Sequence, residues 1–410
     1  MMTKKKQIVW VLVMALITAC SSTPKQETKD AAIIDLSEVE YSTSPQPLSD
    51  FVESIEYIKL SEEPLVTDAR QINIAEDKKG NLYLDVPGGL FKYTPDGTFI
   101  KNLIKIGQGP NEINFKANAI FNFEQEFIQI DDNGKSYYQA ISLNGDFLGR
   151  TNRSLIVDGK YLGRREIYEY WKNFELYKWN SRIDLPNQGE YINRDSLYFF
   201  HIKDLNTDSD IYKMKNHHFH IKGKIDGNWY RNYSYPTYRG ELNDSTYWVK
   251  PLFVDTVYCT SDWTDVRPLY VIKKSSSASD YEWEIKLFAG DRNVSRSELI
   301  NKDRLIDVLA LENGILFTYF VESGKLGAGF CPANGIATTF SKFFKNDVDE
   351  FCPSLNMERR IANRNFFQKE GYIYTLVNAF EFFEEGAKPP FPDLTEDSNP
   401  VIVKLKLKKR

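Results

Sequence analysis

The four histidines of the 410-residue chain lie close together in the sequence, which makes them the first candidates for metal chemistry. In an extended strand, His218 and His220 project from the same face, and His201 can lie on a neighbouring strand. Imidazole is a common zinc ligand, so these three residues form a candidate metal site. His217 points the opposite way and no nearby acid completes a tight ligand spacing. A solvated strand without metal is therefore favoured, and no cofactor is expected.

A second candidate site is the acidic stretch Asn346–Glu350, which contains Asp347 and Asp349. Carboxylates can bind a cation or accept hydrogen bonds from sugar hydroxyls, so both aspartates are candidate ligand-binding residues. A solvated loop is the favoured alternative. Asp131–Gly134 lacks the remaining positions of an EF-hand and predicts a turn.

Aromatic side chains give the stronger functional signal. They crowd into Tyr168–Trp179 and again into Trp229–Trp248. Such rings stack on sugar faces or anchor a protein partner, so Trp171 and Trp179 are candidate ligand-binding residues. The same rings fill gaps between packed sheets, and most of them are expected in the core. The sequence has no G-x-S-x-G, H-E-x-x-H or Gly-rich dinucleotide motif, so no catalytic residue is assigned.

The elements that must position these residues are predicted to be strands. Residues 48–408 are rich in Tyr, Phe, Ile and Val, and short apolar runs recur with polar turns between them. Pro95-Asp96-Gly97 and Asn144-Gly145 each lead into another apolar run, as hairpin turns do. Because no linker interrupts this repetition, one closed ring of sheets is favoured over two sandwiches. The sequence predicts a single all-β propeller over residues 48–410, preferably with six four-stranded blades.

Four short segments resemble the six-bladed, TolB-like β-propeller lipoproteins of Gram-negative bacteria. They are the G-x-G-P-x-E-x segment Gly107–Ile113, Val254–Tyr258, Asn346–Asp349 with the following Cys352-Pro353, and Asn399–Val403. The resemblance begins near residue 50, but residues 151–250 match it poorly, which leaves the outlines of the third and fourth blades open. By analogy with other propellers, Phe51–Leu60 is expected to complete the blade that Val401–Leu407 ends.

The Gly107–Ile113 segment also has a local physical interpretation. Its two glycines permit unusual backbone angles, and Glu112 can accept hydrogen bonds from the amides of the turn. A phosphate cradle is disfavoured because no helix and no lysine follow the glycines. We therefore expect a structural turn here.

The N-terminal residues predict secretion and lipidation. Three lysines precede the apolar run Ile8–Ile17, which is too short to cross a hydrocarbon core of roughly 30 Å. Leu16–Cys20 resembles the lipobox of bacterial lipoproteins, in which the cysteine is acylated, with palmitate for example, before cleavage. We expect residues 1–19 to be removed and Cys20 to carry the lipid. An ordinary secretory signal with an incidental cysteine is the disfavoured alternative.

Residues 20–47 are rich in Ser, Thr, Pro, Lys and Glu, and this composition predicts a flexible tether between the lipid and the propeller. Ser21 follows the cysteine and no acidic run comes after it. By resemblance to known sorting rules, this favours the outer membrane, with the domain facing the periplasm rather than the cell surface.

Cysteine count and charge narrow the remaining choices. Cys259, Cys331 and Cys352 remain once Cys20 is lipidated, so at most one disulfide can form within the chain. A Cys331–Cys352 bridge is possible in an oxidising compartment, but three small buried hydrophobes are favoured. Without residues 1–19 the chain carries 49 basic and 57 acidic residues, a net charge of −8. Compartment and charge together exclude a nucleic-acid partner.

These observations favour a membrane-tethered, non-enzymatic binding or scaffolding protein of the cell envelope, whose partner is an envelope protein, a glycan or another ligand. A rigid ring offers a pocket at its axis and loops on each face. The alternative is a propeller hydrolase or lyase that acts on envelope or imported glycans. Paired acids in a narrow axial cleft, one with a raised pKa, would favour the enzyme.

Overall fold

The computed structural model describes most of the chain from residue 31 onward. The described ranges are 31–66, 72–87, 89–109, 112–114, 116–132, 135–157, 160–180, 198–215, 224–225, 228–229, 237–252, 254–275, 303–321, 324–349, 351, 355, 367–383 and 388–409. Within these ranges the regular structure is almost entirely β, with short 3₁₀ turns at η1 (Leu48–Asp50) and η4 (Ala379–Phe383). The predicted all-β class is confirmed.

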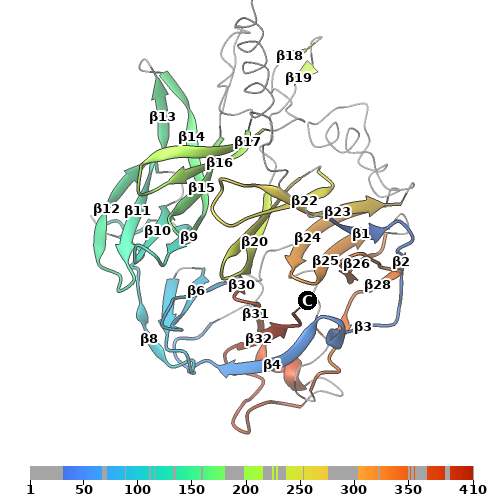
Figure 1. Ribbon diagram of the computed structural model, residues 1–410. Coiled ribbons are helices and arrows are strands. Elements are labelled where there is room, and N and C mark those ends of the chain that lie inside the picture. The colour runs from blue at the N-terminus through green and yellow to red at the C-terminus, as the bar shows by residue number, and fades with distance from the viewer. Residues whose placement is uncertain are drawn as a thin grey trace, which may run out of the picture. The chain divides into compact units, whose positions relative to one another are not determined.

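Six sheets of three or more strands follow one another along the chain (Figure 1). The first contains β5 (Asn73–Glu76), β6 (Leu82–Val86), β7 (Gly89–Tyr93) and β8 (Phe99–Asn102). The second contains β9 (Lys116–Asn122), β10 (Phe127–Asp132), β11 (Tyr137–Ser142) and β12 (Phe147–Asn152). The third contains β13 (Ser154–Val157), β14 (Lys160–Trp171), β15 (Phe174–Asn180), β16 (Tyr198–Asp204) and β17 (Ser209–Lys215).

The other three sheets include segments that are distant in the sequence. The fourth contains β20 (Thr237–Asn243), β21 (Thr246–Pro251), β22 (Thr256–Thr260) and β23 (Arg267–Lys274), extended by β1 (Ala32–Leu36) and β27 (Gly335–Ile336). The fifth contains β24 (Arg304–Leu311), β25 (Gly314–Phe320) and β26 (Leu326–Pro332). The sixth contains β30 (Phe367–Lys369), β31 (Tyr372–Val377), β32 (Val401–Leu407) and β4 (Val52–Lys59).

Three two-stranded ladders complete the described elements. They are β2 (Glu40–Tyr41) with β28 (Thr339–Phe340), β3 (Gln46–Pro47) with β29 (Phe344–Lys345), and β18 (Lys224–Ile225) with β19 (Asn228–Trp229).

Apolar clusters pack each sheet against the next, and the last cluster joins the sixth sheet to the first. Ile128 of β10 packs with Tyr83 of β6, for example, while Leu84 of β6 packs with Leu376 of β31. Central strands are buried on both faces: every residue of β6 is buried, as is nearly every residue of β25. This burial explains the continuous apolar runs in the sequence, because each sheet lies between two neighbours.

The arrangement is that of a single β-propeller, as predicted. Five of the six sheets have the four or more strands of a full blade, and the fifth sheet has three in the part of the chain that the structure describes. The structure thus describes five full blades and one three-stranded sheet, whereas the sequence predicted six four-stranded blades. An isolated bridge between Ala328 and Ser341 lies where β26 meets the chain that follows it.

The predicted hairpin turns are present. Gly97 has a φ of +89° in the turn between β7 and β8, and Gly145 has a φ of +82° between β11 and β12. A Cβ at Gly97 would lie 2.1 Å from the carbonyl oxygen of Lys59, so this turn needs glycine for space as well as for its backbone angle.

Ring closure also agrees with the prediction. Strand β4 pairs antiparallel with β32, with Ile55 opposite Leu405 and Tyr57 opposite Val403. The sixth blade is therefore built from both ends of the described chain, and Figure 1 draws blue β4 beside red β32.

The expected tether over residues 20–47 is wrong in its C-terminal part. Strand β1 adds in parallel to the outer edge of β23, with Ile33 opposite Val271 and Asp35 opposite Lys273. Strands β2 and β3 then pair with β28 and β29. We call residues 32–47 the strap. Its apolar residues Ile34 and Leu36, which a polar composition average conceals, are fully buried between the fourth and fifth sheets. Residues 20–30, with Cys20, lie outside the described residues.

Candidate functional site

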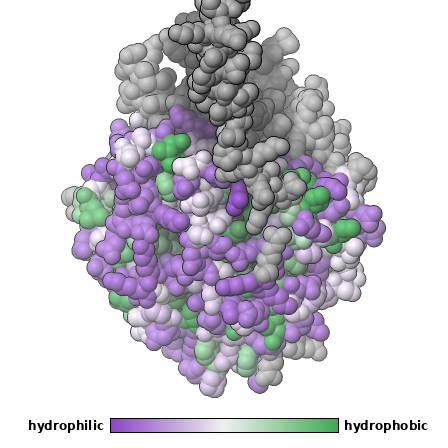
Figure 2. Space-filling view, viewed as in Figure 1, coloured by the Kyte–Doolittle hydropathy of each residue, from purple (hydrophilic) through white to green (hydrophobic). Residues whose placement is uncertain are grey.

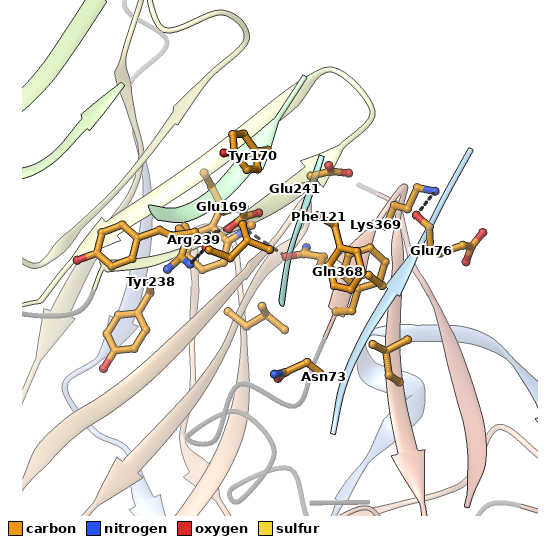
Figure 3. Close-up of a pocket in the computed structure, with 18 of the residues that line it drawn as sticks. Asn73, Glu76, Phe121, Glu169, Tyr170, Tyr238, Arg239, Glu241, Gln368 and Lys369 are labelled. Atoms are coloured by element: carbon orange, nitrogen blue, oxygen red, sulfur yellow. Dashed lines mark hydrogen bonds and ion pairs between the residues drawn. The ribbon is translucent and has the colours of Figure 1, made fainter. Parts of the chain in front are cut away.

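The strongest candidate site is a cavity of about 480 Å³ lined by one strand from each of the six sheets. Strands β5, β9, β14, β20, β24 and β30 all contribute residues to its wall. In five of the sheets this strand is an edge strand of the ladder, and in the third sheet only the short β13 lies beyond it. A cavity shared by all six sheets lies where the sheets converge, so we call it the axial cavity (Figure 3).

Three glutamates from three different sheets line the axial cavity. Glu76 lies at the end of β5, Glu169 on β14 and Glu241 on β20. The side chain of Glu169 is paired with Arg239 of β20, with 2.8 Å between Oε2 and Nε. Arg239 and Glu241 are two residues apart in a regular stretch of the β20 ladder, so they project from the same face of the strand. Glu169, Arg239 and Glu241 therefore belong to one wall of the cavity.

Glu241 is the most perturbed acid in this wall. Burial, followed by the negative charge of Glu169, raises the pKa of Glu241 to about 7. Glu169 and Glu241 thus differ in environment: the first faces a guanidinium group and the second is desolvated beside another carboxylate.

Glu76 supplies an unsatisfied acceptor. Its Oε2 atom is buried and has no hydrogen-bond partner among the described residues. Buried carboxylate oxygens are normally hydrogen-bonded, so an exception in a cavity wall suggests a missing donor.

Three of the residues that line the cavity already donate hydrogen bonds within the protein, whereas the buried Tyr168 hydroxyl has no hydrogen-bond partner among the described residues. Lys369 donates through Nζ to the carbonyl oxygens of Glu76 (3.3 Å) and Asp77 (3.2 Å). Gln368 donates through Nε2 to the carbonyl oxygen of Ala310 (2.8 Å). Arg239 donates through Nη2 to the carbonyl oxygen of Tyr168 (2.9 Å), in addition to its ion pair.

Aromatic residues supply much of the remaining wall. The lining rings are Phe121, Phe123, Tyr168, Tyr170, Tyr238, Trp248 and Phe367. Phe121 and Phe123 stack on each other, with 5.4 Å between ring centroids. Trp248 donates through Nε1 to Oε1 of Gln368 (3.0 Å), so its polar edge is satisfied within the protein. The cavity thus combines ring faces with carboxylate acceptors, as a site for a polar organic ligand requires.

Asp347 and Asp349 lie elsewhere and fasten the N-terminal part of the chain. Asp347 accepts two hydrogen bonds from Ser49, from the backbone N–H (2.8 Å) and from Oγ (2.5 Å). Asp349 accepts hydrogen bonds from the Tyr57 hydroxyl (2.9 Å) and from Nδ2 of Asn346 (2.7 Å). Neither aspartate lines the axial cavity. The acidic cluster joins the Asn346–Asp349 turn to the start of β4.

Trp171 belongs to the core. It is 4 % exposed and packs against Tyr247 and Trp263 between the third and fourth sheets. The favoured interpretation of the aromatic stretch is therefore correct for this residue. Trp179 lies on β15, and its side chain is outside the described set.

His201 is fully buried on β16, and the other two members of the candidate metal site, His218 and His220, lie outside the described residues. The His201 ring stacks on Tyr177, and Nδ1 is 3.6 Å from Oδ2 of Asp210. Although burial raises it, hydrogen bonds from His201 and Tyr177 lower the pKa of Asp210 to about 2. Among the described residues no three His, Cys, Asp or Glu side chains are grouped for metal binding.

The cysteines and the glycine turn behave as the favoured interpretations require. Cys259 and Cys331 are buried and free, so Cys331 forms no bridge to Cys352, a residue outside the described set. In the turn, the Gly109 N–H donates to Oε2 of Glu112 (2.9 Å). A Cβ on Gly107 would meet the same Glu112 carboxylate at 2.1 Å. The glycines therefore make room for a structural carboxylate.

These features define the class: a β-propeller with a mixed aromatic and acidic axial cavity. In the part of the chain that the structure describes, no helix is long and apolar enough to span a membrane.

Among solved structures, a protein of Bacteroides fragilis described as exported is similar over 92 % of this chain and all of its own, with a TM-score of 0.56 and 15 % identity. A DUF4221 family member from Bacteroides vulgatus matches 87 % of this chain and 97 % of its own, at a TM-score of 0.43 and 12 % identity. A third structure, a protein of Agrobacterium tumefaciens described as TolB, matches 70 % of this chain and 93 % of its own, at a TM-score of 0.31 and 11 % identity. The first likeness supports the propeller fold. No family model and no curated protein matches the chain.

Sequence reasoning missed Glu76, Glu169, Arg239 and Glu241 as site residues. Each is a charged residue at or within a strand that mixes polar with apolar residues. A charged residue on a strand does not by itself identify the site, because similar residues occur on outer strands. Which strand of each sheet lies at the axis depends on how the ring closes.

Proposed function

We propose that the protein is a lipid-anchored protein of the cell envelope whose axial cavity binds a small, donor-rich organic ligand without transforming it. The observation that carries this proposal is the contrast, in the cavity wall, between hydrogen-bond donors that are already occupied and carboxyl groups that can still accept hydrogen bonds. The donors on Lys369, Gln368 and Arg239 are occupied by backbone carbonyls, while Oε2 of Glu76 has no hydrogen-bond partner among the described residues and Glu241 is a buried carboxyl group beside Glu169. An occupant must therefore supply donors, as a protonated amine does most strongly.

The aromatic wall further restricts the ligand. Phe121, Tyr168 and Phe367 offer ring faces that favour an apolar or ring-shaped body. A cationic amine also gains from the faces of such rings. The class that fits is a compact, ring-bearing amine, and amino sugars belong to it.

The envelope location is proposed from the N-terminal sequence. The lysine-rich start, the short apolar run and Leu16–Cys20 give the order that secretion and lipidation require. The exported description of the similar Bacteroides fragilis protein is in keeping with this location. We propose an outer-membrane anchor at Cys20 with the propeller in the periplasm.

Catalysis is the second candidate, and one observation favours it. Glu241, with its raised pKa, and Glu169, with its guanidinium partner, line the same cavity. A carboxyl group with a raised pKa beside a second carboxyl group that is held by a guanidinium is the kind of pair that acid–base cleavage of a glycan uses. In this candidate Glu241 is the general acid and Glu169 the base.

Calorimetric titration with glucosamine and with glucose tests the binding proposal, because the two sugars share the ring and differ in the amine. We expect glucosamine to bind more tightly, and the Glu76→Gln/Glu241→Gln double variant to lose this preference. Asp347→Asn serves as the control, since it changes an acid outside the cavity. Equal or absent binding of both sugars would contradict the donor-rich ligand class.

Two further experiments separate the alternatives. Release of smaller sugars from envelope glycans, lost in Glu241→Gln, would establish the enzyme in place of the binding protein. In-cell cross-linking followed by mass spectrometry tests for an envelope protein partner. A recurrent, near-stoichiometric partner would replace the small ligand as the principal function. For the anchor, Cys20→Ala should abolish lipidation, and an unchanged membrane fraction and mature mass would refute it.

A further inference from the structure

The outer edge of the fourth sheet carries an exposed apolar patch where the described chain begins. Ile33 on β1 and Val271 on β23 are directly opposite each other, and they are 41 % and 38 % exposed. On the other side of β1, Ile336 of β27 is opposite Asp35 and is 57 % exposed. Partners in a parallel ladder project from the same face, so these three aliphatic side chains form one surface. We call it the strap patch.

Neighbouring residues show that this face is the outward one. The alternating residues Ile34, Tyr270 and Ile272 are buried in the cluster between the fourth and fifth sheets. On the outward face, Nζ of Lys273 lies 3.7 Å from Oδ2 of Asp35, which neutralises the carboxylate closest to the patch. The patch is held rigidly, because the Ile33 N–H donates to Oδ1 of Asn334 (3.0 Å) in addition to the ladder.

Single exposed aliphatic residues are ordinary on a protein surface, and the face in Figure 2 has several small hydrophobic groups separated by hydrophilic ones. The strap patch differs in its position on the chain. It begins at Ile33, the residue after Ala32, and only residues 21–31 lie between Ala32 and Cys20. An extended chain of that length spans at most about 40 Å.

This length restricts which side of the body can touch the membrane. A compact domain of this size has a diameter of about 55 Å. If the opposite rim touched the bilayer, Ala32 would lie farther from it than the linking residues reach. The edge that carries the strap patch is therefore held on the membrane side by covalent length alone.

We propose that the strap patch docks on the surface of the membrane in which the lipid of Cys20 is inserted. Docking of three side chains needs only a weak intrinsic affinity for the membrane, because the anchor holds the patch at high local concentration. Lys273 can extend its ammonium group to the headgroups while its stem stays on the patch. The docked edge fixes which rim of the propeller faces away from the membrane.

The proposal rests on the lipid anchor, and its test uses the mature lipidated protein in phosphatidylethanolamine–phosphatidylglycerol vesicles. An environment-sensitive fluorophore is attached to Ile336→Cys or, as a matched control, to Leu148→Cys. Leu148 is 58 % exposed and lies on β12 of the second sheet. The unsubstituted protein, labelled in parallel, gives the contribution of the native cysteines. We expect a blue shift and quenching by nitroxide lipids at position 336 only.

Two additional outcomes make the test decisive. Ile33→Ser/Val271→Ser in the Ile336→Cys background should reduce the shift and quenching while the protein still floats with the vesicles and melts cooperatively. Equal fluorescence at positions 336 and 148 in floating protein would overturn the docking proposal. Failure to float at all would instead refute the anchor, and with it the proposed envelope function.

Discussion

Glu241 allows the environment of the axial cavity to be measured as a pH dependence of stability. A carboxyl group whose pKa rises on folding binds its proton more tightly in the folded state. Stability therefore falls as the pH rises from the unfolded value of 4.5 through the folded value of about 7, and stays lower above it. The substitution Glu241→Gln removes this titration and keeps the shape of the side chain.

The expected magnitude follows from the two pKa values. Their difference corresponds to a penalty of about 3 kcal/mol above pH 7, and solvent in the cavity reduces it. Unfolding entropy is about 2.1 cal/mol/K per residue, so for the body from Ala32 to Arg410 this penalty equals a Tm difference of about 4 °C. We expect Glu241→Gln to melt higher than the natural protein at pH 8, and to lose most of that advantage at pH 5.

Thermal unfolding followed by circular dichroism at pH 5 and pH 8 provides the measurement. Glu38→Gln is the control, since it removes an exposed carboxylate outside the cavity and should leave the pH dependence unchanged. A Glu241→Gln protein with the same pH dependence as the natural chain would refute the reasoning. It would mean that Glu241 is solvated, and the catalytic candidate would lose its acid.

Three other predictions concern the ring and its fastenings. Deleting Val401–Arg410 removes β32 from the middle of the sixth sheet, so the cooperative unfolding transition should disappear; a retained transition in calorimetry would argue against closure there. Asp347→Ala removes two hydrogen bonds from Ser49 and should lower the free energy of unfolding by about 1 kcal/mol in urea titration, whereas Asp244→Ala, on an exposed turn, should not. Burial raises the pKa of Cys331 to about 11, and Cys259 is also buried. Neither thiol should therefore react with Ellman's reagent until the protein unfolds. Rapid reaction of both thiols in the native state would contradict their burial.

Local features of the fold were predictable because they depend on residues that are close together in the sequence. The hairpin at Gly97 and the closing strand Val401–Leu407 follow from turn chemistry and alternating apolar residues. The strap was not predictable, because the short apolar cluster Ala31–Leu36 lies in a polar stretch and becomes a strand only where β23 offers it an edge to join.

The candidate site depends on long-range geometry and was therefore missed. Asp347 and Asp349 looked available for a ligand, but Ser49 and Tyr57, far away in the sequence, use their oxygens. Glu241 looked like one surface acid among many, yet the six converging sheets desolvate it. Residue type indicated which chemistry was possible at each position. Which positions face the cavity depends on how the six sheets are arranged around it.

The strap and β4 also determine the order in which the protein can fold. The first residues of the described chain find their partners only after β23, β28, β29 and β32 exist, and β32 is the last described strand in chain order. Until then the edges of β23 and β31 are unpaired and can accept a strand from another molecule. Such distant pairings make folding slow. A chaperone that holds the N-terminal segment during export would therefore protect the step at which the ring is most exposed to misassembly.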